Sequence, residues 1–202
     1  MKKSLITTVI LTVLIVVYAF TPSGRQSSPA TVSVVSDVPL FIFSEPVADY
    51  EIVGKALSVG NILKLSIDEE STIEQKAEDV VALAISRKEK GKVPEFDAII
   101  LDLENEKAHA IKFKGEVSLK ATIKECKGVP VYLFSTPDDE YEVVAELPAD
   151  ISVRAQRNGM LYDKIKSMVT RTLKKEEAGE VKHFDAIIID PKDLSETLIK
   201  FK

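Results

Sequence analysis

The chain of 202 residues contains one cysteine, two histidines and no tryptophan. A single cysteine allows no internal disulfide, so the hydrophobic core alone must stabilise the fold. Cys126 aligns with Val35 in an internal repeat, which favours a small buried hydrophobe over a thiol that cross-links two chains. Zinc and copper sites usually need several His and Cys ligands at short spacing, whereas His109, His183 and Cys126 are far apart in sequence. We therefore predict no metal site and no cofactor.

Recognisable catalytic motifs are also missing. Glycine is scarce, with eight residues in the chain, and its tightest grouping, Gly54 with Gly60, does not form a phosphate-binding loop. Cys126 and His109 could supply a nucleophile and a base, but no activating elbow flanks either residue. We predict no catalytic residues and a protein that is not an enzyme.

Basic residues are fewer than acidic ones, 27 against 32, giving a net charge of −5. Lys2, Lys3 and Arg25 are the only charged residues before Thr31, so the remaining chain is still more acidic. Nucleic acids and anionic lipid surfaces require concentrated Lys and Arg, so neither is an expected partner.

The N-terminus has the pattern of an export signal, because Lys2 and Lys3 precede an uncharged apolar run at residues 5–20. This run is shorter than the roughly 20 residues that span a bilayer comfortably, and Ala19 provides a cleavage position. Cleavage is the expected outcome, and an uncleaved membrane anchor is the alternative. In both cases the rest of the chain lies outside the cytoplasmic membrane, in the periplasm or cell envelope. Residues 21–30 are expected to form a flexible leader.

The rest of the sequence repeats itself. Residues 38–44 match residues 129–135 at an offset of 91, and residues 96–102 match residues 184–190 at an offset of 88. A period near 90 residues indicates tandem copies of a small domain. The predicted organisation is a signal and leader at 1–30, a first domain at 31–114, a connector at 115–128 and a second domain at 129–202.

Each copy predicts an α+β domain with the order ββαββ. Residues 38–44 read as a buried strand that ends in a turn at Glu45-Pro46, and further strands follow at 50–57 and, more weakly, at 62–67. Ser71 with Glu74 forms a capping-box pattern before a helix, and Asn158 is the corresponding cap in the second copy. Apolar residues recur at helical spacing after both caps: Ile73, Ala77, Val80, Val81 and Ala84, and Leu161, Ile165, Met168, Val169 and Thr172.

The helix is followed by a strand at 96–103 that is apolar on both faces, which is typical of a central strand covered on two sides. An alternating segment at 108–114 suits an antiparallel partner strand. The predicted fold is a mostly antiparallel sheet with one helix packed on a face, present twice, behind an N-terminal export signal or anchor helix.

This order resembles the small bacterial βαββ envelope domains of the YbjQ-like and RcsF-like type. Residues 50–54 and 97–100 carry the resemblance in the first copy, and residues 141–145 and 185–188 carry it in the second. The resemblance implies a fold and an envelope setting, with association into assemblies or with protein partners. Some such domains are described as metal-binding, but this sequence contains no set of metal ligands.

Two groups of residues are candidate sites. Phe41 and Tyr132 occupy matching positions in the first strands, and Tyr50 and Tyr141 match at the start of the second strands. If the outer faces of these strands were uncovered, the four rings would form an apolar interface, although core closure is the more ordinary role of the tyrosines.

A cleft between the copies is the other candidate, and Asp102 and Asp190 are its predicted lining residues. Asp97 and Asp185 precede the same strands and are expected to accept backbone N–H bonds. The leading functional hypothesis is an exported protein that binds another protein or itself. The alternative is a module that binds a small molecule or ion in the cleft between the copies.

Overall fold

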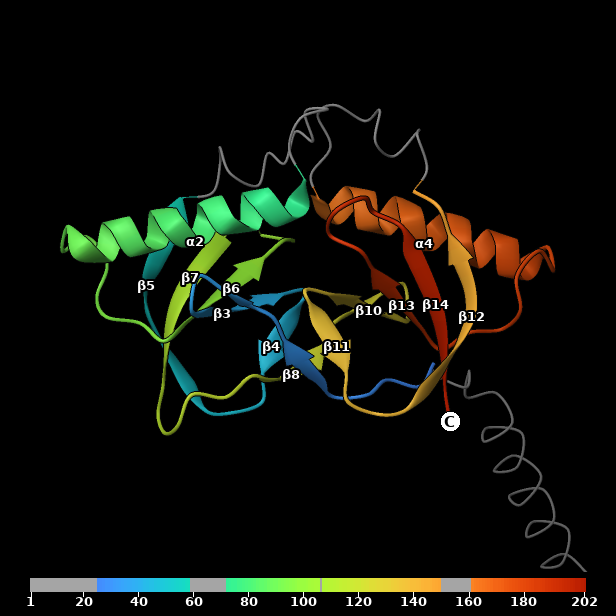
Figure 1. The fold of residues 1–202 in the computed structure, drawn as a ribbon, viewed down its shortest axis with the longest axis horizontal. Helices are drawn as coiled ribbons and strands as arrows, with labels where there is room; N and C mark the ends of the chain where they lie inside the picture. Colours follow the sequence, from blue (N-terminus) through green and yellow to red (C-terminus); the bar gives the residue numbers. More distant parts are fainter. Residues whose placement is uncertain (1–24, 59–71, 106, 150–160) are drawn as a thin grey trace, which may run out of the picture.

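The protein is described by a computed structural model for residues 25–58, 72–105, 107–149 and 161–202. Two helices lie end to end along one side of the molecule, and strands fill the rest (Figure 1). The described strands form three sheets, two with five strands and one with four. The α+β class expected from the sequence is confirmed.

The first five-stranded sheet has the order β2-β3-β6-β7-β5. Its strands are β2 (Val34–Val35), β3 (Val38–Ile42), β5 (Tyr50–Ser58), β6 (Ala98–Asp102) and β7 (Lys107–Phe113). β3 and β6 are parallel and the other pairs are antiparallel, so the sheet is mixed. The apolar strand at its centre is β6, as the two-faced pattern predicted. Ile99 and Leu101 join one buried cluster, while Ala98 and Ile100 join another.

The second five-stranded sheet has the order β12-β14-β13-β10-β9, with the corresponding strands in corresponding places. Its strands are β9 (Glu125–Cys126), β10 (Val129–Leu133), β12 (Tyr141–Leu147), β13 (Ala186–Ile189) and β14 (Glu196–Phe201). Here too one pair, β10 with β13, is parallel. Cys126 is buried in β9, where its thiol acts as a small apolar group.

Each five-stranded sheet carries one helix on its outer face, α2 (Ile73–Glu89) or α4 (Leu161–Glu177). The predicted apolar faces are the buried ones in both helices. The capping box of α2 is one residue later than predicted. It is formed by Thr72 and Gln75, whereas Ser71 and Glu74 were the predicted pair. Ser71 and Asn158 lie outside the described residues.

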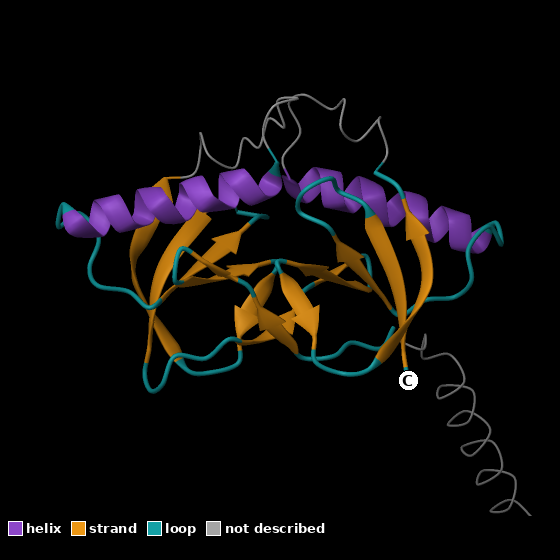
Figure 2. Cartoon of the chain, viewed as in Figure 1, coloured by secondary structure: helices purple, strands orange, loops and turns teal. Residues whose placement is uncertain are grey.

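A four-stranded sheet joins the two halves at the centre of the molecule (Figure 2), in the order β11-β1-β8-β4. Its strands are β1 (Ala30–Val32), β4 (Ser44–Pro46), β8 (Lys120–Ile123) and β11 (Ser135–Pro137). β1 pairs with β11 of the second half, β8 pairs with β4 of the first half, and Ala30 pairs with Ala121 between them. The halves therefore exchange strands. The segment 115–128, expected to be a connector, contains β8 and β9.

The chain passes from the outer sheets into the central sheet at Phe43 and Phe134. Both residues have a positive φ, 56° and 55°, which is uncommon for a residue with a large side chain. The resulting bend starts β4 and β11, so the turn predicted at Glu45-Pro46 is wrong and the chain continues there as a strand. The predicted strand at 62–67 lies outside the described residues.

Residues 25–30 also differ from the expected flexible leader, because they pack on the second half. The Arg25 guanidinium donates to the Phe184 carbonyl and pairs with Glu176, and it lies over the Phe184 ring, 4.2 Å from the centroid. Backbone and hydroxyl hydrogen bonds at Ser28 hold the segment before β1 begins. Polar contacts and one cation–π contact thus replace the apolar content that the segment lacks.

Candidate functional site

Phe41 and Tyr132 cannot form the predicted exposed interface, because both side chains are fully buried. The central sheet covers the faces of β3 and β10 that were expected to be open. Phe41 packs edge-on against Phe113, and Tyr132 packs edge-on against Phe201. The sequence hypothesis required uncovered strand faces. They are covered by β1, which spans the predicted boundary between the leader and the first domain, and by β8 in the segment read as a connector.

Tyr50 and Tyr141 are half-buried at the starts of β5 and β12. Tyr50 packs at the margin of the cluster around Phe41, and Tyr141 packs at the margin of the cluster around Tyr132. Burial raises the pKa of Tyr50 above its ordinary value, with a smaller contribution from Glu45. Both rings close the edges of a core, which was the more ordinary of the two roles weighed for them.

Asp97 and Asp185 hold the last strand of each half. An Asp97 carboxylate oxygen accepts the backbone N–H of Phe113 at 2.9 Å, and Asp185 accepts that of Phe201 at 3.0 Å. Acceptance of backbone N–H groups was predicted for both side chains, and their donors are strand residues sixteen positions later in the chain.

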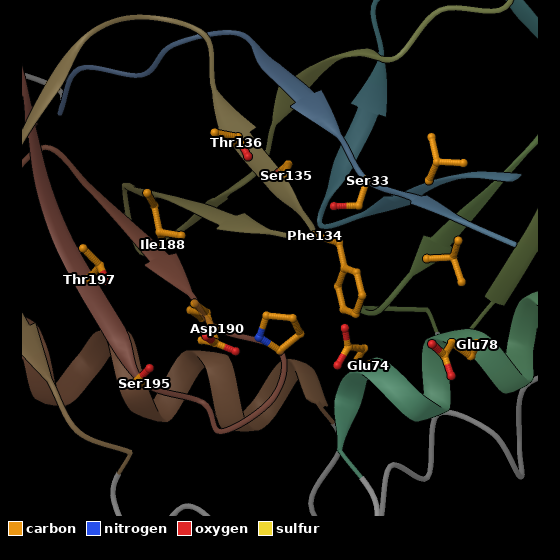
Figure 3. Close-up of a pocket in the computed structure, with 14 residues that line it drawn as sticks. Ser33, Glu74, Glu78, Phe134, Ser135, Thr136, Ile188, Asp190, Ser195 and Thr197 are labelled. Carbon is orange, nitrogen blue, oxygen red and sulfur yellow. The ribbon is translucent and has the colours of Figure 1, made fainter. Parts of the chain in front are cut away.

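One pocket lies between the two halves, with a volume of about 420 Å³. The first half contributes residues of β2 and α2, and the second half contributes β11, β13, β14 and their loops (Figure 3). The lining residues are Ser33, Val34, Val35, Glu74, Glu78, Phe134, Ser135, Thr136, Ile188, Ile189, Asp190, Pro191, Ser195 and Thr197. Its size falls within the range of about 300–1,000 Å³ that is usual for small-molecule sites.

Contacts between the halves fix the walls of this pocket. The Pro191 carbonyl accepts the backbone N–H groups of Ile73 and Glu74, at 3.1 and 3.4 Å, and so caps α2 from the second half. Ser33 donates its backbone N–H to the Phe134 carbonyl at 2.8 Å. These bonds satisfy helix and strand ends that would otherwise be unpaired, and they join the two sides of the pocket.

Carboxylates lie on both sides of the pocket. Figure 3 shows Glu74 and Glu78 projecting from α2 near the Phe134 ring, with Asp190 on the side that belongs to the second half. One Asp190 oxygen accepts the backbone N–H of Lys192 at 2.7 Å, which fixes the carboxylate at the end of β13. Lys192 Nζ lies 4.0 Å from a Glu74 oxygen and is largely exposed.

The equivalent place in the other half holds an aromatic pair. Tyr162 occupies the position of α4 that Glu74 occupies in α2, and its ring packs against Phe43 with centroids 6.1 Å apart. Phe43 is the counterpart of Phe134. Lys124 and Glu45, the counterparts of Ser33 and Thr136, form an ion pair at 2.9 Å. One half therefore has an aromatic pair where the other has a polar pocket.

The structure separates the two aspartates that were predicted to share a cleft. Asp190 lines the pocket, whereas Asp102 caps the turn after β6 by accepting the backbone and side-chain N–H groups of Asn105 at 3.0 and 2.9 Å. Burial alone would raise the pKa of Asp102, but these hydrogen bonds outweigh it and the pKa is lowered.

The sequence reading missed Glu74 and Glu78 as site residues. Glu74 was assigned to a capping box, and Glu78 was not considered. A signal was present: the copies match closely, yet Glu74 aligns with Tyr162 and Glu78 aligns with Lys166. Differences in charge and ring content at otherwise matched positions mark the place where the two halves diverge.

His183 and His109 are in unrelated settings. His183 Nδ1 lies 2.7 Å from a Glu176 oxygen at the surface, while His109 Nδ1 is buried in β7. Within the ranges that the structure describes, no three His, Cys, Asp or Glu side chains are grouped so that they could hold one metal ion.

In the same ranges, no helix combines the length and the apolar character needed to cross a bilayer.

Comparison with known proteins gives no family assignment. No family model, no curated protein and no solved structure matches the chain.

Proposed function

We propose that this chain is a binding protein that holds a small polar ligand in the pocket between its two halves. The observation that carries the proposal is the convergence of polar side chains from both halves on one cavity of about 420 Å³. A cleft that served only for packing would be lined mainly by aliphatic or aromatic groups, such as the Phe43–Tyr162 pair at its counterpart. This function is the one that the sequence placed second.

The proposal includes a tandem duplication. In the central sheet, Ala30 pairs with Pro137 and Ala121 pairs with Pro46, so both registers follow the same offset of 91. Two copies of one ancestral domain would first have formed two like pockets. The copy with Glu74 would then have kept its pocket, and the copy with Tyr162 would have closed it.

Export is part of the proposed setting, on the strength of the charged and apolar pattern at residues 1–20. The same pattern allows an uncleaved anchor that tethers the protein to the membrane. Binding of a solute outside the cytoplasmic membrane needs neither an enzyme motif nor a bound metal.

A thermal-shift screen of polar metabolites against the full chain tests the function. A ligand present at one hundred times its Kd stabilises the native state by about 2.7 kcal/mol, which corresponds to an increase in Tm of about 5 to 10 °C for a domain of this size. Glu74→Tyr copies the closed counterpart and should abolish the shift. Asp102→Asn is the matched control and should retain it. A screen without a pocket-dependent hit would refute the proposal.

Assembly through strand edges is a second candidate, and a specific observation favours it. β5 and β12 are the outer strands of their sheets, and they expose Ile52 and Val143 at matching positions, 57% and 53% accessible. Unpaired strand edges with apolar side chains favour pairing with another chain. Sedimentation of the double variant Ile52→Lys/Val143→Lys beside the native chain tests this role, and a native monomer at high concentration would exclude it.

A further inference from the structure

The pocket between the halves is acidic. Three carboxylates line it, from Glu74, Glu78 and Asp190, and no Lys, Arg or His is among its lining residues, although the largely exposed Lys192 lies 4.0 Å from Glu74. Glu78 forms no salt bridge with any residue in the described part of the chain. A ligand with negative charge would be repelled here, whereas a cation would find several partners.

A buried hydroxyl points to a ligand independently of these charges. Ser135 lines the pocket, is 8% exposed, and its Oγ has no hydrogen-bond partner among the described residues. Buried polar groups in native structures are normally hydrogen-bonded, so an unpaired one beside a cavity indicates a missing partner. Its counterpart Ser44 also has no hydrogen-bond partner among the described residues, and it lies in the half where Tyr162 packs against Phe43 and Lys124 pairs with Glu45.

The spacing of the carboxylates distinguishes a metal ion from an organic cation. Glu74, Glu78 and Asp190 line one pocket, yet they are not grouped closely enough to bind a single ion together. A divalent metal needs several oxygens at about 2.0–2.6 Å, which a dispersed set does not provide. A molecule with two positive ends can reach carboxylates on opposite sides of the cavity.

We propose that the pocket binds a small aliphatic amine that carries two or more ammonium groups. One ammonium group is held by Glu74 and Glu78 of α2, and another is held by Asp190 at the end of β13. Hydroxyls of Ser135 and its neighbours accept the remaining N–H donors. This proposal rests on the proposed ligand-binding function and specifies its ligand class.

The internal repeat predicts the stoichiometry. The second half replaces Glu74 with Tyr162 and Glu78 with Lys166, and it replaces Ser33 with Lys124. In this counterpart place the Tyr162 ring packs against Phe43, Lys166 replaces the negative charge of Glu78, and the Lys124–Glu45 ion pair adds no net charge. One ligand per chain is therefore expected, despite the two similar halves.

Isothermal titration of the full chain in detergent micelles tests the proposal, with putrescine and spermidine as probes. 1,4-Butanediol is the uncharged match for putrescine, and Ca²⁺ and Mg²⁺ are the metal probes. The expected result is a 1:1 complex with the amines and none with the diol. Glu74→Gln and Asp190→Asn should each weaken binding about tenfold, while the matched control Asp102→Asn should stay within about twofold.

Different results would contradict different claims. If a neutral or anionic compound binds, the Glu74→Tyr variant abolishes that binding, and the amines do not bind, the ligand class is wrong but the proposed function stands. If Ca²⁺ or Mg²⁺ binds with the same sensitivity to Asp190→Asn while the amines do not, the site is a metal site. Undiminished amine binding to Glu74→Gln/Glu78→Gln/Asp190→Asn would mean that the amines bind elsewhere. If neither these probes nor a metabolite library binds, the proposed function itself fails.

Discussion

The Tyr132 hydroxyl forms hydrogen bonds with both the backbone N–H and the backbone carbonyl of Ser28, although the two residues are 104 positions apart. The buried hydroxyl donates to the Ser28 carbonyl at 2.8 Å and accepts the Ser28 N–H at 2.9 Å. Burial, with smaller effects from Asp139 and Asp138, raises the pKa of Tyr132 to about 12, against the opposing hydrogen bond at Ser28. The hydroxyl therefore remains protonated at physiological pH and can serve as donor and acceptor at once.

Tyr132→Phe should loosen the N-terminal segment. The substitution leaves two buried backbone groups unpaired at Ser28, which costs about 1 to 3 kcal/mol. Urea unfolding should show a lower midpoint with an unchanged m-value, and limited proteolysis should cut near residues 25–30 more readily. Tyr141→Phe is the control, because Tyr141 is only half-buried. Equal effects of the two variants would contradict this account.

The same contacts predict which form of the chain is mature. Cleavage after Ala30 would remove Arg25 and Ser28 with their contacts, and it would place a charged amino terminus in the central sheet beside β11. If the chain is exported as proposed, we therefore expect cleavage near Ala19 or retention of the N-terminal segment. The intact mass of the exported protein decides, and a mature chain that begins at Thr31 would contradict the prediction.

Lys164 is predicted to destabilise the fold at neutral pH. Its side chain is fully buried in α4, and Nζ has no hydrogen-bond partner in the described part of the protein. Burial, and then the nearby charge of Lys76, lower its pKa below the ordinary value. Lys164→Met should therefore raise the free energy of unfolding by about 1 to 3 kcal/mol.

The pH dependence of this effect has a definite sign. Between the lowered pKa of folded Lys164 and its ordinary value, the unfolded state binds more protons, so the stability of the native chain rises with pH across that window. Lys164→Met should remove this rise. Lys166→Met, an exposed lysine on the same helix, should leave the pH profile unchanged. Urea titrations at several pH values give the comparison, and parallel profiles for native chain and Lys164→Met would contradict it.

Glu196 is a buried carboxylate that ties β14 to α4. It is fully buried and accepts hydrogen bonds from Thr172 Oγ1 at 2.6 Å and from the Arg171 guanidinium at 2.7 Å. Glu196→Gln removes the charge but keeps the size, and it should cost about 1.5 to 3 kcal/mol of stability. Glu142→Gln on the exposed side of β12 is the matched control. A chemical-denaturation midpoint that does not change for Glu196→Gln would show that the charge is not needed.

Local features of the fold could be predicted because they depend on neighbouring residues. Helical spacing identified the buried faces of α2 and α4, and the capping box was misplaced by one position because Thr72-Gln75 and Ser71-Glu74 offer similar patterns. The two-faced apolar character of residues 98–101 identified β6 as the central strand.

Long-range relationships were predicted less well. The sequence indicated that Phe41 and Tyr132 match, but β1 and β8 cover their strands, and segments of only three and four residues give little sign of a strand. Asp190 was predicted to line the cleft and does, whereas Asp102, at the end of β6, caps the following turn by accepting the N–H groups of Asn105. Neither outcome follows from the strand pattern, because the pattern is identical in the two copies.

By itself, the sequence determined the α+β class, the buried helix faces and the absence of an internal disulfide, since each depends on composition or on spacing along the chain. The tertiary structure decided the exchange of β1 and β8, the docking of residues 25–30 and the acidic pocket between the halves. These features arise from contacts between residues about 50 to 160 positions apart. Glu74 leaves space for a pocket beside Phe134, whereas its counterpart Tyr162 packs against Phe43.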